Sequence, residues 1–426
     1  MSTTNVVIVG AGFAGLNCAK RLGAVDGLAV HVIDRRNHHL FQPLLYQVAM
    51  AGLSPAEVAV PIRSLLSRYE NVHVIQAEAT GIDVDAKSVQ TSAGPFPYDY
   101  LVLATGALHA YFGRDEWEVY APGLKTIEQA TEIRRRVLHA FESAEVETDV
   151  ERRRSLLSFV VVGGGPTGVE LAGALGEMTR YTLARDFKRI DPKVTRIILI
   201  EAGPRILPTF DPDLSSRAAR DLESLGVQVW TESAVTDVDA GGVWVGKERI
   251  TAHTILWGAG VRASAIGSAV TPETDRQGRV RVGPDLSLKD DPSVFVAGDL
   301  AHFEQEGEAL PGVATVALQQ GRHIAQTIRD ECAGRPRTAF RYFDKGQMAT
   351  IGRRRAVLQS GRVKLAGFPA WIAWLLVHIY YLSGFRNRLI VLFQWAWSYF
   401  TFARGARLIV EKSWRSYGDE DPAAGP

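Results

Sequence analysis

One pattern occurs twice in the chain and restricts its fold more than any other feature: an apolar strand, then a glycine-rich turn, then a helix. The strands are short, continuous runs rich in β-branched residues, which is typical of strands buried on both faces of a parallel sheet. We therefore expect an α/β fold with two Rossmann-like dinucleotide-binding units. The runs are Asn5 to Val9, followed by Gly10, Gly12 and Gly15, and Phe159 to Val162, followed by Gly163, Gly165 and Gly168.

The spacing of these glycines suits the binding of a pyrophosphate. The first glycine makes a tight turn, the second lets the backbone approach the phosphates, and the third lets helix and strand pack closely. The N-terminus of the following helix adds free N–H groups and a partial positive charge. One such loop alone can be an ordinary strand–helix turn. Two such loops, each between a strand and a helix, predict that the chain binds two nucleotides.

Each unit also has a strand that ends on a carboxylate, Asp34 in the first and Glu201 in the second. A carboxylate at that place can accept hydrogen bonds from ribose hydroxyls. Asp34 follows its loop at about the usual spacing of ~20 residues. Glu201 follows at a longer spacing, which an insertion between Thr179 and Val194 can absorb.

Two nucleotides on one chain make chemical sense as a flavin and a nicotinamide, because hydride passes directly between them. A further strand, Ser293 to Ala297, should return to the first sheet and bring Asp299 beside the flavin; the alternative role for Asp299 is a helix N-cap. The second unit then interrupts the first and holds the exchangeable NADH. We expect an FAD domain over 1–121 and 268–330, an NADH domain over 122–267, and a C-terminal region over 331–426.

Composition excludes several other classes. With 48 basic and 47 acidic residues, the chain carries no charge excess of the kind that binds nucleic acid. Its two cysteines, Cys18 and Cys332, form no Cys-x-x-Cys pair, which argues against a disulfide reductase and against a metal site. Such low cysteine usage fits a reducing compartment. The first strand begins at Asn5 and leaves no room for a signal peptide, so we expect folding in the cytoplasm.

The C-terminal region contains two short runs crowded with aromatic and aliphatic residues, Pro369 to Leu382 and Leu389 to Ala403. Each is shorter than the ~20 residues that a membrane-spanning helix needs. The second run has a polar stripe and arginines on both sides, which predicts helices lying in a membrane interface at about 369–403. A buried core hairpin, a dimer interface and a transmembrane hairpin are the alternatives. The stripe is Gln394, Ser398 and Thr401, and the arginines are Arg386, Arg388, Arg404 and Arg407.

Several motifs together resemble the type II NADH:quinone oxidoreductases, flavoproteins with two dinucleotide-binding domains. The resemblance covers nearly the whole chain. Its most specific part is the segment Phe41 to Gln47, since the glycine loops are shared with many reductases. The other matching segments are Gly10 to Leu16, Leu103 to Gly106, Val162 to Glu170, Trp257 to Gly260, Ala297 to Asp299 and Ala349 to Gly352.

The resemblance implies a set of binding residues. Those implied for FAD are Gly10, Gly12, Phe13, Ala14, Gly15, Asp34, Arg35, Pro43, Leu44, Ala79, Ala104, Thr105, Gly106 and Asp299. Those implied for NADH are Gly163, Gly165, Pro166, Thr167, Gly168, Glu201 and Gly260.

Two further residues take catalytic roles by the same resemblance. Glu170 is implied in proton handling and Gln319 in quinone contact; the alternatives are a solvated helix glutamate and a helix-surface glutamine. The chain departs from the family at Thr315, where the family often has the first glutamine of Ala-Gln-x-Ala-x-Gln, and this puts the partners of Gln319 in doubt.

The expected function is therefore that of a non-proton-pumping respiratory enzyme, in which hydride passes from NADH to FAD and two electrons pass on to a membrane quinone. The expected location is peripheral, at the cytoplasmic face of the cell inner membrane, in contact with the lipid surface. A homodimer remains open, and no nucleic acid or metal is expected. The alternatives are a soluble NADH reductase that feeds an electron-carrier protein and a non-enzymatic flavoprotein scaffold that senses NADH.

Overall fold

The structure is a computed structural model that describes residues 3–401 and 405–410. The chain divides into two compact units, each built from three separate segments. The first unit contains Met1–Leu40, Ala59–Ala110 and Gly260–Lys345, and the second contains Phe41–Val58, Tyr111–Ala259 and Gly346–Pro426. The divisions after Ala110 and Ala259 lie earlier than the expected ones after 121 and 267. In addition, the segment Phe41–Val58 groups with the second unit instead of the first.

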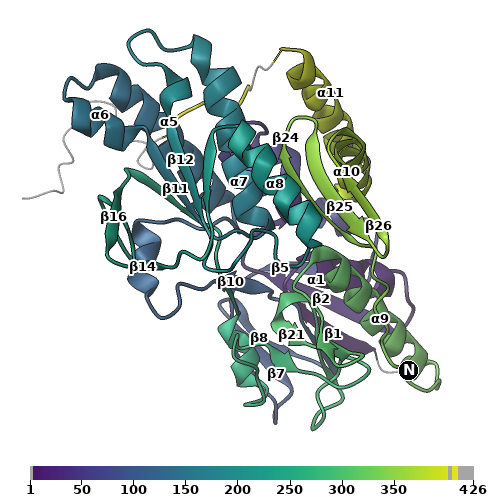
Figure 1. Cartoon of the computed structure of the whole chain (residues 1–426). Helices are drawn as coiled ribbons and strands as arrows, with labels where there is room; N and C mark the ends of the chain where they lie inside the picture. The colour runs from purple at the N-terminus through teal and green to yellow at the C-terminus, as the bar shows by residue number, and fades with distance from the viewer. Residues whose placement is uncertain (1–2, 402–404, 411–426) are drawn as a thin grey trace, which may run out of the picture. The chain divides into compact units, whose positions relative to one another are not determined.

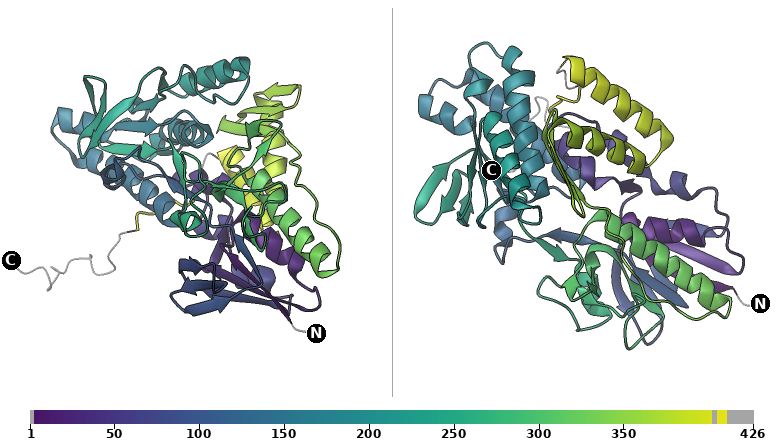
Figure 2. Two further views of the ribbon diagram at one scale, coloured as in Figure 1. Left: turned by 90° about the horizontal axis from the view of Figure 1, so that it is seen from below. Right: turned by 45° about the vertical axis from the view of Figure 1, so that its right-hand side comes forward.

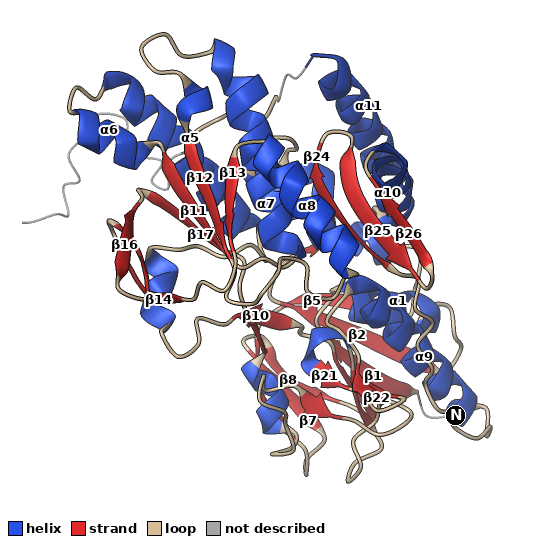
Figure 3. Ribbon diagram, viewed as in Figure 1, coloured by secondary structure: helices blue, strands red, loops and turns tan. Residues whose placement is uncertain are grey.

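The first unit is built on a parallel sheet of the expected kind (Figures 1 and 3). Helices α1 (Phe13–Leu22) and α9 (Ala314–Cys332) lie side by side on one face of this sheet. The backbones of the two helices approach so closely that a Cβ on Gly321 would lie 2.1 Å from the carbonyl oxygen of Ala14. The strand order is β20 (Val294–Val296), β9 (Tyr100–Leu103), β1 (Thr4–Val9), β2 (Leu28–Asp34) and β5 (Val72–Gln76).

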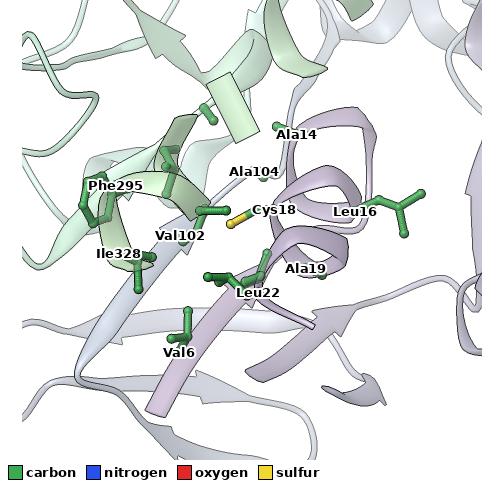
Figure 4. Packing of buried hydrophobic residues seen from close by; sticks show 14 of the residues in the cluster. Val6, Ala14, Leu16, Cys18, Ala19, Leu22, Val102, Ala104, Phe295 and Ile328 are labelled. Atoms are coloured by element: carbon green, nitrogen blue, oxygen red, sulfur yellow. The ribbon is translucent and has the colours of Figure 1, made fainter. Parts of the chain in front are cut away.

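The pairing of β20 with β9 confirms that the strand near Ser293 returns to the first sheet. Apolar side chains fill the layer between the sheet and the two helices, where Cys18 packs among residues such as Val6, Val102 and Ile328 (Figure 4). Burial raises the pKa of the Cys18 thiol, so this cysteine is a core residue and not a reactive one.

Short strands, the short helix α4 (Ile62–Leu66) and 3-10 turns at Ala265–Ala269 and Gly298–Leu300 also belong to the first unit. The strand groups are β3 (His38–Leu40) with β4 (Ala59–Pro61); β6 (Ala79–Asp83), β7 (Ser88–Thr91) and β8 (Gly94–Pro97); β10 (Ala107–His109) with β18 (Val261–Ala263); β19 (Val280–Arg281) with β21 (Ala301–His302); and β22 (Glu304–Gln305) with β23 (Glu308–Ala309).

The second unit repeats the architecture with a four-stranded parallel sheet. Its order is β13 (Val227–Trp230), β12 (Arg196–Ile200), β11 (Ser158–Val162) and β17 (Thr254–Trp257). The helices are α5 (Ile127–Val146), α6 (Val150–Leu156), α7 (Pro166–Glu177) and α8 (Pro212–Ser224), and a small antiparallel sheet contains β14 (Val235–Asp239), β15 (Gly242–Val245) and β16 (Glu248–Thr251).

The long spacing before Glu201 has a structural cause. After α7 the chain makes a π-helical turn at Met178–Thr182 and 3-10 turns at Leu183–Arg185 and Pro192–Val194 before it enters β12. The insertion expected between Thr179 and Val194 is therefore confirmed as a set of short turns.

The C-terminal part of the second unit is an antiparallel sheet followed by two helices, α10 (Phe368–Tyr381) and α11 (Phe385–Thr401), which lie side by side (Figure 2). The sheet consists of β24 (Gln347–Gly352), β25 (Arg355–Ser360) and β26 (Val363–Ala366). Two short helices from the segment Phe41–Val58, α2 (Leu45–Ala49) and α3 (Pro55–Val58), belong to the same unit.

Helix α11 begins earlier than expected, because Gly384 takes a positive φ of 87° and makes the turn just before it. Arg386 and Arg388, expected to precede the helix, therefore lie within it. The expected end at Ala403 and the flanking Arg404 lie outside the described residues. Within the ranges that the structure describes, no helix is long and apolar enough to cross a membrane.

Candidate functional site: two nucleotide loops and an acid-lined cavity

The loop between β1 and α1 has three glycines with three different surroundings. Gly10 has a φ of +98°, and a Cβ there would lie 2.5 Å from the carbonyl oxygen of Ala104. A Cβ on Gly15 would lie 1.9 Å from the carbonyl oxygen of Gly10, so this glycine lets helix and loop touch. Gly12 differs, because its nearest protein atom would be 4.0 Å away. The space beside Gly12 is therefore open to a ligand at the start of α1, where no side chain caps the helix.

The loop between β11 and α7 has the same arrangement. Gly163 has a φ of +104°, and a Cβ on Gly168 would lie 1.8 Å from the carbonyl oxygen of Gly163. A Cβ on Gly165 would meet nothing within 4 Å. Pro166 and Thr167 form the first turn of α7, which also has no side-chain cap. Both loops thus combine a tight turn, a close packing contact and an open position.

Each loop is tied to the carboxylate at the end of the second strand of its unit. Asp34 accepts hydrogen bonds from the N–H groups of Ala11 (2.7 Å) and Arg36 (2.8 Å). Glu201 accepts from the N–H groups of Gly164 (2.6 Å) and Gly203 (2.7 Å). A carboxylate has about four lone-pair sites, so both groups keep acceptor capacity for a ribose hydroxyl.

Other residues of the first unit fit a flavin nucleotide. The hydroxyl oxygen of Thr105 is buried and has no hydrogen-bond partner among the described residues, next to the carbonyl of Ala104 that closes on Gly10. Asp299 follows Gly298, whose N–H donates to the side-chain oxygen of Gln320 at 2.7 Å. Gln320 is fully buried and thus positions the Asp299 turn.

The remaining residues implied for FAD in this unit form its near surroundings. Phe13 and Ala14 begin α1, with the Phe13 ring edge-on to His39 at 5.3 Å. Arg35 lies 4.0 Å from Glu78, and Ala79 begins β6. Gly106 has a φ of +70° and meets nothing within 4 Å.

Three implied residues fall in a different unit from the one expected. Pro43 and Leu44 form a 3-10 turn in the segment that groups with the second unit. Gly260, implied for NADH, begins the last segment of the first unit. Their roles stay predictions.

A cavity of about 100 Å³ lies within the second unit, lined by residues of α2, α7, β24, α10 and α11. Glu170 of α7 lines it, and its side-chain oxygen lies 3.5 Å from the backbone N–H of Thr350 in β24. The surrounding protein desolvates this carboxyl and raises its pKa to about 8. Glu170 is only partly exposed, lining the cavity, and desolvation by its surroundings favours the protonated form at neutral pH.

The helix that carries Glu170 is held rigidly against β24. A Cβ on Gly173 would lie 2.2 Å from the carbonyl oxygen of Ile351, so only glycine allows this approach. Two turns after Glu170 on the same helix, Glu177 accepts the backbone N–H of Arg353 at 3.2 Å and lies 3.8 Å from its guanidinium. Both side chains are largely buried.

Sequence reasoning missed the aromatic and polar lining of this cavity. The indole N–H of Trp395 donates to Gln47 at 2.8 Å, and Gln394 donates to the buried carboxyl of Glu57. Trp374 and Trp371 also line the cavity. The concentration of tryptophan after residue 370 is visible in the sequence, but it was interpreted as a membrane-binding feature and not as the lining of a cavity.

Gln319 is engaged within the first unit. Its side-chain amide donates to the carbonyl oxygen of Phe343 at 2.9 Å and accepts the N–H of the same residue at 3.0 Å. Thr315, at the departure from the family pattern, is hydrogen-bonded to the hydroxyl of Tyr342 at 3.0 Å. A quinone contact by Gln319 stays a prediction. The quinone would have to compete for a side-chain amide that is already hydrogen-bonded to the backbone of Phe343.

The two C-terminal helices each have an inner and an outer stripe. On α11, Asn387, Val391, Gln394 and Trp395 face the protein, and Asn387 donates to the carbonyl oxygen of Ala56 at 3.2 Å. On α10 the inner residues are Ala370, Trp374 and His378. The outer stripes are apolar and exposed: Phe368, Ile372, Leu376 and Tyr380 on α10, and Phe385, Leu389, Leu392, Phe393 and Trp397 on α11.

Comparison with known proteins agrees with this geometry. Residues 4–321 match the family model described as pyridine nucleotide-disulphide oxidoreductase. The chain is 43% identical to the type II NADH:quinone oxidoreductase Ndh of Mycobacterium tuberculosis over 423 residues, which cover 96% of this chain and 90% of that protein. It is 44% identical to NdhA of the same organism over 425 residues, covering 96% and 89%.

Solved structures share the fold at lower sequence identity. NDH2 from Plasmodium falciparum in complex with NADH matches with a TM-score of 0.88 at 19% identity, covering 96% of this chain and 100% of that one. The sulfide:quinone oxidoreductase of Aquifex aeolicus matches with a TM-score of 0.73 at 19% identity, covering 90% and 92%.

Proposed function

Because the chain belongs to the type II NADH:quinone oxidoreductases, we propose that it is a non-proton-pumping respiratory enzyme that passes two electrons from NADH through FAD to a membrane quinone. The observation that carries this proposal is the pair of loops with open central glycines, Gly12 and Gly165, each tied to a strand-end carboxylate. FAD supplies the chemistry that accepts a hydride and returns two electrons.

The two units take different nucleotides in this proposal. The first binds FAD, with its pyrophosphate beside Gly12, a ribose on Asp34, and the free hydroxyl of Thr105 and the turn at Asp299 along the rest of the cofactor. The second binds NADH, with its pyrophosphate beside Gly165 and the adenosine ribose on Glu201.

Quinone reduction also consumes two protons, and Glu170 is the proposed source of one of them. Its carboxyl is protonated below a pH of about 8 and lines a cavity that can hold several waters, since one water needs ~10–15 Å³. The Glu170 side-chain oxygen releases its proton to the reduced quinone oxygen and regains one through the cavity.

The outer stripes of α10 and α11 are the proposed contact with the membrane surface, at its cytoplasmic face. Their exposed residues are large and apolar, and Arg386 lies among them on α11. Helices of this kind bind by burying an apolar face below the lipid headgroups while cationic side chains stay at the anionic surface.

Steady-state turnover tests the proposed activity. Purified holoprotein should oxidise NADH continuously when a short-chain quinone is added. A protein that reduces its flavin once and then stalls would be an NADH sensor. One that turns over with an acceptor dye but not with quinone would be a reductase that feeds another carrier.

A further inference from the structure

We propose that Trp374 is the residue that positions the quinone ring in the Glu170 cavity, by donating its indole N–H to one of the two quinone carbonyl oxygens. This inference rests on the proposed function, because it takes quinone as the substrate. It assigns a polar contact to Trp374 of α10, a residue that lies 204 positions after Glu170 in the sequence.

The first support is an unused donor. Trp374 is only 2% exposed, and its indole nitrogen is buried without a hydrogen-bond partner in the part of the chain that the structure describes. A buried donor without an acceptor is unfavourable, because it has lost its hydrogen bonds to water. By contrast, Trp395, which lines the same cavity, donates to Gln47 at 2.8 Å. Of these two indoles, that of Trp395 is satisfied and that of Trp374 has no acceptor among the described residues.

The second support is that neighbouring rings fix the Trp374 ring in place. His378 stacks on it with ring centroids 4.1 Å apart, and Trp395 and Tyr46 contact it at 5.4 and 6.5 Å. Burial lowers the pKa of His378 to about 4, so this stacked ring is neutral and adds no charge to the cavity. The indole N–H is thus held in one direction before any ligand arrives, which reduces the entropy lost on binding.

The third support is the chemistry of the lining. Tyr46, Trp371 and Leu375 offer flat or apolar surface, and Arg353 is paired with Glu177. The protonated carboxyl of Glu170 and the indole of Trp374 are two donors that a neutral ligand can use. A ring with two carbonyl oxygens matches two donors and no free charge. The volume of about 100 Å³ is of the same order as the ~150 Å³ of a cavity that holds benzene.

The test is the substitution Trp374→Phe, which keeps an aromatic ring and removes the N–H. We expect the KM for a short-chain quinone to rise roughly 3- to 10-fold, the effect of losing one neutral hydrogen bond. The rate with ferricyanide, which has no carbonyl group, and the flavin content should stay at wild-type values. Trp244→Phe, in the separate sheet of β14 to β16, is the matched control and should change neither KM nor rate.

An unchanged quinone KM in a Trp374→Phe protein that retains its flavin would overturn the inference and leave the proposed function intact. Failure of the wild type to turn over with any quinone would overturn the proposed function itself. If Trp374→Phe does not fold, the wild-type holoprotein labelled with nitrogen-15 in its tryptophans gives a second measurement. Added 1,4-naphthoquinone should shift one buried indole N–H resonance, and a spectrum without such a shift contradicts the inference.

Discussion

The carboxylate of Glu201 holds its loop, because its two oxygens accept the N–H groups of Gly164 and Gly203, and we propose that it also binds the nucleotide. The nearby Arg205 is a candidate for binding a 2′-phosphate, but its guanidinium donates to the carbonyl oxygens of Phe210 (2.6 Å) and Pro208 (2.7 Å). With the arginine engaged and the carboxylate repelling phosphate, the second unit should select NADH over NADPH.

Glu201→Gln should reduce this selectivity. The amide loses the charge that repels a 2′-phosphate, and its NH2 group cannot accept a backbone N–H. We expect kcat/KM for NADH to fall roughly 10-fold or more, because a hydrogen bond to a charged group contributes about 1.5–3 kcal/mol. The value of kcat/KM for NADPH should fall less. The ratio of the two kcat/KM values measures the effect. Equal use of both nucleotides by the wild type would contradict the assignment of Glu201.

Glu170 should make stability depend on pH. Its pKa is about 8 in the folded protein against an ordinary value of 4.5, so the folded state binds the extra proton between these values. The free energy of unfolding therefore falls as pH rises from about 4.5 to 8. Glu170→Gln, which cannot ionise, should show a weaker decline over this window in denaturant titrations at several pH values. Parallel stability profiles for the two proteins would show that Glu170 is solvated.

At the scale of elements, the strand–loop–helix unit has separable positions for folding and for binding. In the first loop, a side chain at Gly15 would collide with the loop itself, whereas a side chain at Gly12 would enter open space. A substitution at Gly15 therefore tests the packing of the loop, and a substitution at Gly12 tests the binding of the ligand.

Gly12→Val should give a folded protein without FAD, because the valine occupies the space assigned to the pyrophosphate. Gly165→Val should keep FAD and weaken NADH binding. Gly15→Val should fail to fold, since its Cβ alone would approach the carbonyl oxygen of Gly10 to 1.9 Å. Flavin absorbance, circular dichroism and NADH titration distinguish the three outcomes. A Gly12→Val protein with full flavin would contradict the loop assignment.

The elements that sequence could predict are those with a local signal. The strands ending at Val9 and Val162 were predicted within a residue or so, since continuous apolar runs and glycine spacing are properties of neighbouring residues. The cavity around Glu170 was not predicted, because it forms through contacts between distant parts of the chain. Glu170 contacts Thr350, and Gln47 contacts Trp395. Residues so far apart in sequence leave no shared pattern in a single chain. The grouping of Phe41–Val58 with the second unit depends on the same kind of contact.

For the whole molecule, the outer stripes of α10 and α11 predict lipid binding that can be removed without disturbing either nucleotide. Truncation after Gly367 is a poor test, because it would uncover Glu57, whose partner is Gln394, and would remove the cavity wall at Trp374. Substitution of exposed side chains avoids this difficulty.

Replacing Leu376, Phe393 and Trp397 together by glutamine should lower binding to anionic vesicles by more than tenfold. Burying each such side chain contributes about 1.5–3 kcal/mol. Activity with an acceptor dye should be unchanged. The matched control replaces Val146, Val150 and Val194, which are exposed valines of the same unit, and should bind vesicles like the wild type. If instead vesicle binding is unaltered and a dimer dissociates, the stripes cover a second copy of the chain.

The pairing of β20 with β9 has a consequence for the protein during its synthesis. Leu103 leaves the ribosome ~190 residues before Val294 and Val296 can pair beside it, a delay of roughly 10–40 s at about 5–20 residues per second. During that time the nascent first sheet exposes an unpaired strand edge, the feature through which chains join one another. A nascent chain in which β20 is delayed or deleted should therefore be more prone to aggregate than the complete one.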